Sequence, residues 1–269
     1  MINNKYYSID CHCHIYPEKI ASKAVKGTDT FYDSISVGTG LVDDMLMRAD
    51  RAGIDRAIVQ SVATTPHQVS SINRFIAAEV ERFPDRLIGF GTLHPASENI
   101  IGDLEELLSL GLLGVKLHPD IQDFKIDDHR ALKIYEACEE KGVPILFHAG
   151  DNRYDRSNPN RLVPVLSIYN RLTVIAAHFG GYSIWPEAVQ KLSGIPNLYV
   201  DCSSSMPFLS DAEIRSLIEA YGYDRSLFGT DYPMWSSESE VQRLLSLGLP
   251  DEAYRKIFSE NLIKALNLK

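Results

Sequence analysis

The stretch SIDCHCHIYP, residues 8–17, decides the fold because it combines the pattern of a buried strand with four side chains that can bind metal. Side chains of a strand alternate between its two faces. A regular strand therefore separates His12 and His14 from Cys11 and Cys13, which excludes a zinc knot built on all four. We expect the histidines to point into a site and the cysteines to pack against outer helices.

Seven further runs rich in apolar and β-branched residues follow, and each leads through a polar loop into a stretch with helical periodicity. The eight runs cover residues 7–14, 56–62, 87–93, 114–118, 144–150, 173–178, 198–204 and 227–231. They recur at spacings of about 30 residues, which is typical of repeated strand–helix units. The sequence therefore predicts an α/β fold, a (β/α)8 TIM barrel, as one domain over residues 1–269.

Helices are predicted where apolar residues recur every three to four positions and then stop at glycine or proline. Such stretches end before Gly53, Pro84, Gly111, Gly142 and Gly222. Ser210 is the expected N-cap of the fifth, and one last helix is predicted from Asp251 to Leu268. Residues 18–37 and 151–159 are expected to be long loops that form walls of an active site.

Composition narrows the range of partners. The formal net charge of −9 and the lack of a basic cluster argue against a nucleic-acid partner. No stretch reads as a secretory signal or as the roughly 20 apolar residues of a membrane span. The four cysteines are too scattered for a disulfide framework. We expect a cytoplasmic protein that acts on a small molecule. The sequence is compatible with either a monomer or a homo-oligomer.

Histidines and an acid stand near the ends of several predicted strands. Besides His12 and His14, they are His118, His148, His178 and Asp231. The carboxyl ends of barrel strands converge on one mouth, so these side chains are expected to be neighbours in space. Imidazoles and a carboxylate that meet at one point suit a divalent transition ion, with zinc as the first expectation and manganese as the alternative.

These residues lie in five short sequence motifs that follow one another along the chain. The segments are DCHCHIYP (10–17), GVKLHP (114–119), LFHAG (146–150), AAHFGG (176–181) and GTDYP (229–233). Together they resemble the amidohydrolase superfamily, in particular the amidohydrolase-related branch of metal-dependent hydrolases and nonoxidative decarboxylases. The resemblance covers nearly the whole chain.

The resemblance implies a role for each matching residue. His12, His14, His148 and Asp231 would ligate the metal, and His178 would bind a second ion or lie beside the metal-bound water. Lys116 matches a lysine that bridges two ions once it is carboxylated. The alternative is an unmodified amine that binds a substrate carboxylate or pairs with Asp231. One or two ions per chain are therefore expected.

The main prediction for function is a hydrolase that uses metal-activated water on an amide, lactone or ester bond. Asp231 would take and return the proton, and His178 would orient the water or stabilise the oxyanion. Lys116 favours this over the first alternative, a nonoxidative decarboxylase of a small carboxylic acid. The second alternative is a catalytically silent metal-binding protein.

Substrate contacts are predicted at four further positions. His118 shares strand parity with Lys116 and should face the mouth. Arg153, in the loop after the fifth strand, could grip a carboxylate or phosphate. Tyr232 and Trp235 follow Asp231 and could wall an apolar pocket.

Overall fold

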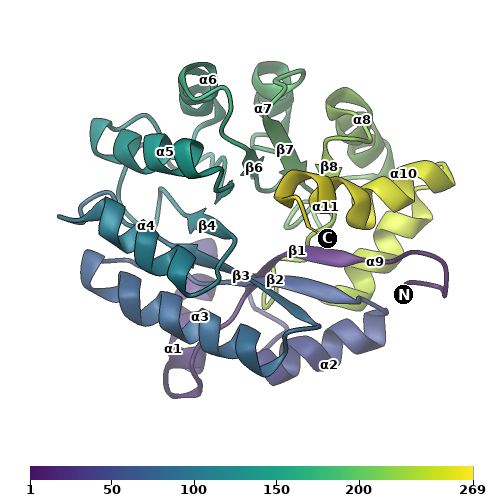
Figure 1. Ribbon diagram of the computed structural model, residues 1–269. Coiled ribbons are helices and arrows are strands. Elements are labelled where there is room, and N and C mark those ends of the chain that lie inside the picture. Colours follow the sequence, from purple (N-terminus) through teal and green to yellow (C-terminus); the bar gives the residue numbers. More distant parts are fainter. Residues whose placement is uncertain (269) are drawn as a thin grey trace.

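Eight parallel strands form one sheet in sequence order in the computed structural model, which describes residues 1–268. They are β1 (Ile9–His14), β2 (Arg56–Gln60), β3 (Leu87–Thr92), β4 (Gly114–Leu117), β5 (Ile145–Phe147), β6 (Val174–Ala176), β7 (Leu198–Asp201) and β8 (Ser226–Leu227). Backbone hydrogen bonds from Cys11 N to Phe228 O and from His14 N to Tyr232 O join the last strand to the first. The predicted (β/α)8 barrel is confirmed (Figure 1).

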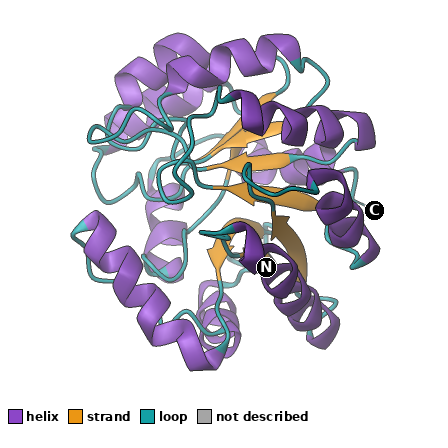
Figure 2. Cartoon of the chain, turned by 90° about the vertical axis from the view of Figure 1, so that its left-hand side faces the viewer, coloured by secondary structure: helices purple, strands orange, loops and turns teal. Residues whose placement is uncertain are grey.

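Helices surround the strands on the outside of the barrel, as Figure 2 shows. They include α2 (Val42–Ala52), α3 (Val69–Arg82), α4 (Ile100–Ser109), α5 (His129–Lys141), α6 (Pro159–Ile168), α7 (Trp185–Leu192), α8 (Asp211–Tyr221) and α9 (Ser237–Ser246). A short 3-10 turn, η1 (Pro66–Gln68), precedes α3. Within residues 1–268, none of the helices combines the length and apolarity needed to cross a membrane.

The predicted helix ends follow from local chemistry. Gly53 and Gly142 end α2 and α5 with φ of 77° and 66°, in the left-handed region that glycine adopts without strain. Ser210 begins α8 with a capping box, in which its hydroxyl accepts from the backbone N–H of Glu213.

One prediction about the helices is wrong. Residues 18–37 are not a loop, because they contain α1 (Glu18–Tyr32), of which only Ala21 is buried. Most residues of this helix are polar or small, so the apolar repeat by which core helices are recognised is weak.

The last helix forms where it is predicted, and it contains one irregular turn. It consists of α10 (Asp251–Arg255), a π-helical turn η2 (Lys256–Glu260) and α11 (Asn261–Leu266), which follow one another without a break. A single wider turn leaves no trace in apolar periodicity.

The strict alternation predicted for the first strand is also wrong. The pairing of β1 with β2 shifts register between Asp10 and Cys13, as at a β-bulge. As a result Cys11 packs in the barrel interior, whereas Cys13 packs in the core beneath the outer helices. The prediction that both cysteines face outward therefore fails for Cys11, since an extra residue reverses the side-chain parity.

A small core fills the barrel itself. Its strand residues come from every strand except β4 among those that the structure describes, and they are Ile9, Cys11, Ile58, Ile88, Phe90, Leu146, Ile175, Tyr199 and Leu227. On β4, Val115 and Leu117 pack in the outer core, so the intervening Lys116 points inward. Leu262 of α11 also packs into this interior core.

Glu240 of α9 gives the stability of the fold a dependence on pH. Its side chain is buried, and its Oε2 has no hydrogen-bond partner within residues 1–268. Burial raises the pKa of Glu240 from 4.5 to about 8. Folding therefore favours the protonated acid, and this contribution is complete below the unfolded value of 4.5 and lost as the pH rises through about 8.

We expect Glu240→Gln to leave stability unchanged near pH 4 and to raise the free energy of unfolding near pH 9, where the buried carboxylate must be charged, by up to about 5 kcal/mol. Urea unfolding at the two pH values measures the difference. Glu219→Gln, at an exposed position of α8, is the control. Equal effects of Glu240→Gln at both pH values would contradict the assignment.

Candidate metal centre

Three of the predicted ligands converge at the mouth of the barrel. The Nε2 atoms of His12 and His14 lie 3.2 Å apart. The Oδ1 atom of Asp231 lies 3.4 Å from the first of these nitrogens and 3.6 Å from the second. Two imidazoles from β1 and a carboxylate from the segment after β8 therefore present lone pairs to one point, a grouping that can hold a metal ion.

The other predicted ligands extend this group. Nδ1 of His148 lies 3.1 Å from Nε2 of His178, and the ring of His178 stacks on that of His12 with centroids 5.3 Å apart. Nζ of Lys116 donates to Nε2 of His12 at 2.9 Å. All six predicted residues line one end of a cavity of about 700 Å³. We call this end, formed by His12, His14, Lys116, His148, His178 and Asp231, the metal end.

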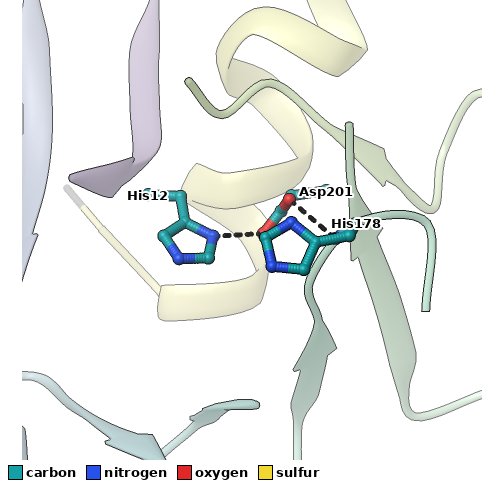
Figure 3. A group of neighbouring side chains, drawn as sticks. All are labelled: His12, His178 and Asp201. Carbon is teal, nitrogen blue, oxygen red and sulfur yellow. Dashed lines mark hydrogen bonds and ion pairs between the residues drawn. The ribbon is translucent and has the colours of Figure 1, made fainter. Parts of the chain in front are cut away.

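Asp201, at the end of β7, orients two of the histidines (Figure 3). Nδ1 of His12 donates to its Oδ2 at 3.0 Å, and the backbone N–H of His178 donates to its Oδ1 at 3.1 Å. A carboxylate can only accept here, so the proton of His12 is on Nδ1 and the lone pair of Nε2 faces the cavity. Nδ1 of His178 donates to the carbonyl of Ser203 at 2.9 Å, which leaves Nε2 of His178 as a lone pair as well.

The surroundings keep the imidazoles neutral and the acid charged. Burial lowers the pKa of His14 and His148 well below the ordinary value, and that of His178 to about 4. Burial acts against the ionised form of Asp231, but attraction to the neighbouring imidazoles when these are protonated, together with the hydrogen bond from Ser204, outweighs it and holds the pKa of this carboxyl below its usual range. Metal ligands must be deprotonated, so these groups are in the required state at neutral pH.

Asp231 is fixed from both sides. Before it, Thr230 donates its backbone N–H and its hydroxyl to the buried carboxylate of Asp10, at 3.0 and 2.6 Å. Beyond it, Ser204 donates to Oδ2 of Asp231 at 2.5 Å and itself accepts from Nε1 of Trp235. Oδ1 of Asp231 is thus the oxygen that remains for an ion.

The backbone at two of these residues is unusual. His178 has φ of 60° and Asp231 has φ of 58°, both in the left-handed region that residues with a Cβ seldom enter. Such conformations tend to cluster where a side chain must be held in a particular place. Here they turn the two side chains toward the mouth directly after β6 and β8.

The four predicted substrate contacts divide into two pairs. His118 lines the 700 Å³ cavity, and Trp235 lines an adjoining cavity of about 220 Å³ that also reaches Asp231. The hydroxyl of Tyr232 instead donates to Leu41 O and Asp44, away from both cavities.

Arg153 is occupied by the protein itself. Its guanidinium binds both oxygens of Asp151 at 2.9 and 2.7 Å and donates to the carbonyl of Phe31 at 2.6 Å. It lines neither cavity, and it anchors the C-terminal end of α1 to the loop after β5.

Other members of the site were missed in the sequence. Asp201 lies inside the predicted run 198–204, and only the structure shows that β7 ends at this residue, so the rule of strand ends did not single it out. The hydroxyl of Tyr32 lies 2.7 Å from Nε2 of His118 and close to His148. Tyr32 belongs to α1, whose existence was not predicted, and its sequence carries no signal for this position.

The donor set fits a divalent transition ion. Neutral imidazoles with oriented lone pairs, together with one ionised carboxylate, are the ligands that zinc accepts, and manganese also takes carboxylate and imidazole. The hydrogen bond from His12 to Asp201 supplies the supporting carboxylate that commonly accompanies a metal-bound histidine.

A family model described as amidohydrolase matches residues 9–268. The chain belongs to this family. The resemblance stated from the sequence is confirmed, as is the prediction of an enzyme of the amidohydrolase superfamily, and membership supports a divalent metal as cofactor.

Solved structures match this amidohydrolase along nearly its whole length. An uncharacterised TIM-barrel protein from Bordetella bronchiseptica is 22% identical with a TM-score of 0.82, over 97% of this chain and 98% of that one. The 5-carboxyvanillate decarboxylase LigW from Sphingomonas paucimobilis is 17% identical with a TM-score of 0.76, over 98% and 100%. A dihydroxybenzoic acid decarboxylase from Polaromonas, solved with manganese and 2-nitroresorcinol, is 17% identical with a TM-score of 0.76, over 98% and 97%. These likenesses show the fold.

We expect His12→Ala and Asp231→Asn to abolish activity while the far-ultraviolet circular dichroism stays that of the wild type, because each removes a predicted ligand without touching the core. His129→Ala, at an exposed position of α5, is the matched control. Full turnover in either site variant would remove these residues from the centre.

A second expectation concerns Asp201. Asp201→Asn places an amide where Nδ1 of His12 needs an acceptor, so the affinity for zinc or manganese should fall by about 10- to 100-fold. Competition with a chromophoric chelator measures the affinity, and Asp211→Asn, exposed on α8, is the control. An unchanged affinity would mean that Asp201 does not orient a ligand.

Proposed function

We propose that this amidohydrolase is a metal-dependent nonoxidative decarboxylase of a small carboxylic acid. The observation that carries the proposal is the place of Lys116, whose amine lies beside the imidazoles and Asp231 at the metal end of a cavity with largely apolar walls. The solved decarboxylases of the same fold support it further. This reverses the order of the two functions predicted from the sequence, where Lys116 favoured hydrolysis.

Binding follows from charge. A divalent ion held by His12, His14, His148 and Asp231 would supply a Lewis acid for the oxygens of the acid substrate. The ammonium of Lys116 attracts the same carboxylate, and the apolar walls keep water from it. A carboxylate loses the stabilisation of water in such surroundings, whereas carbon dioxide does not need it, so the walls favour loss of carbon dioxide.

The reaction also needs a proton. When the bond between the carbon and its carboxylate breaks, carbon dioxide leaves and the electron pair stays on the carbon, which must then take up a proton. Asp231 is held ionised and has no proton to give at neutral pH. Burial lowers the pKa of Lys116 to about 8, so its ammonium is both present and acidic enough to deliver the proton, and its amine is recharged from solvent.

Hydrolysis of an amide, lactone or ester remains the second candidate. The position of Asp231 favours it, because an ionised carboxylate at the metal end, with Oδ1 not engaged by Ser204, can take a proton from a water held there. The two reactions differ in their products, so a direct measurement separates them.

We expect the manganese- or zinc-reconstituted protein to release one carbon dioxide per product from a member of a panel of aromatic acids that runs from hydroxybenzoates to larger acids with more than one ring. In heavy water the product should carry one deuterium on the carbon that held the carboxylate. Cleavage of esters or lactones without release of carbon dioxide would establish the hydrolase. Silence on both panels with metal bound would favour a metal-binding protein.

Lys116→Met should lower kcat for decarboxylation by about 10²- to 10⁴-fold, the usual worth of a proton donor, with the metal content unchanged. Lys23→Met, which alters an exposed lysine of α1 that lines neither cavity, is the control. Loss of one equivalent of metal from Lys116→Met would instead assign Lys116 as a bridging ligand.

A further inference from the structure

The part of the 700 Å³ cavity beyond the metal end has walls of apolar side chains from two helices. Ile20, Ala24 and Phe31 come from α1, and Ile72 and Phe75 come from α3. The three residues of α1 share one helical face, since they are spaced by four and seven positions. We call the space between these five side chains the apolar trough.

Ile20 and Ala24, on the apolar face of α1, lie outside the buried core of residues 1–268, whereas Phe31 near the end of the helix stacks on the ring of Tyr154. Ala21 is the single fully buried residue of this helix, and Ile20 remains 43% exposed. Contacts at the C-terminal end of α1 hold it in place as a wall, namely the bond from Arg153 to the carbonyl of Phe31 and the bond between Tyr32 and His118. Apolar area that is left facing a cavity can be removed from water only by a ligand.

The hydroxyls along the trough are already satisfied by the protein. That of Thr28 donates to Ala24 O, that of Ser61 to Ile15 O, and that of Ser71 to Gln68 O. Thr64 donates to Oε1 of Gln68. These hydroxyls have spent their donors, so apart from the exposed ammonium of Lys19, strongly polar recognition is concentrated at the metal end of the cavity.

The cavity is also larger than a single aromatic ring requires. An apolar cavity of roughly 150 Å³ is enough to hold a benzene molecule, and the cavity here measures about 700 Å³. A benzoic acid with its carboxylate at the metal end would therefore leave most of the trough empty.

We propose that the substrate carries, beyond its acidic head, an apolar body larger than one aromatic ring, and that this body lies in the trough between α1 and α3. The identity of the head as a carboxylate rests on the proposed decarboxylase function. The inference of an apolar body depends only on the side chains that line the trough.

Binding of two unreactive acids tests the proposal. Isothermal titration of the manganese-reconstituted protein with benzoate and with biphenyl-4-carboxylate should show that the biphenyl acid binds at least about tenfold more tightly, because its second ring buries further apolar area. Ala24→Trp fills the trough from α1 and Ile72→Trp fills it from α3. Each should remove the preference and leave the affinity for benzoate unchanged.

Ser22→Trp is the matched control on α1, where it adds the same side chain at an exposed position outside the cavity. It should keep the preference. Equal affinities of the wild type for the two acids, absence of binding by both, or an undiminished preference in Ala24→Trp and Ile72→Trp would overturn the proposal. If the protein prefers the biphenyl acid but releases carbon dioxide from no acid, the apolar trough is supported and the decarboxylase function is rejected. If it releases carbon dioxide but shows no such preference, the decarboxylase function is supported and the apolar trough is rejected.

Discussion

The buried carboxylate of Asp201 accepts a hydrogen bond from Nδ1 of His12, and the arrangement of the metal end depends on this contact between β7 and β1. Both side chains are almost completely buried, at 1% and 0% exposed, so solvent screens their interaction little. Once the proton of His12 is fixed on Nδ1, its other nitrogen has to face Asp231 and Lys116. The same carboxylate holds the backbone of His178, and one residue thereby sets two of the converging imidazoles.

This arrangement of buried polar groups is costly for the fold. Apolar side chains fill the barrel interior from the other strands, whereas β4 brings the amine of Lys116 inward. Burial disfavours the charged amine, which is why its pKa falls to about 8. Buried polar groups and residues with left-handed backbone lie together at the strand ends. Such a grouping is expected at an active site, where the geometry needed for catalysis lowers the stability of the fold.

Much of this could be predicted from the sequence, because the barrel repeats one local pattern. Alternating strands and helices identified the fold, and the position of His148, His178 and Asp231 at strand ends predicted that they meet. What could not be predicted depends on departures from regularity. The bulge in β1 reversed the side of Cys11, a π-helical turn lies within the last helix, and α1 was missed since its apolar face turns to a cavity instead of the core.

Two kinds of segment form the cavity: the strand ends carry the predicted metal ligands, and α1 forms an apolar wall. The metal end is built from strand termini whose positions are locked by the closed sheet, and a change there disturbs several hydrogen bonds at once. The wall formed by α1 contributes a single buried residue to the core, so most substitutions on its inner face leave the free energy of folding little altered. Descendants of this sequence can therefore acquire new ligands by variation within residues 18–32 while the ancestral chemistry at the strand ends is kept.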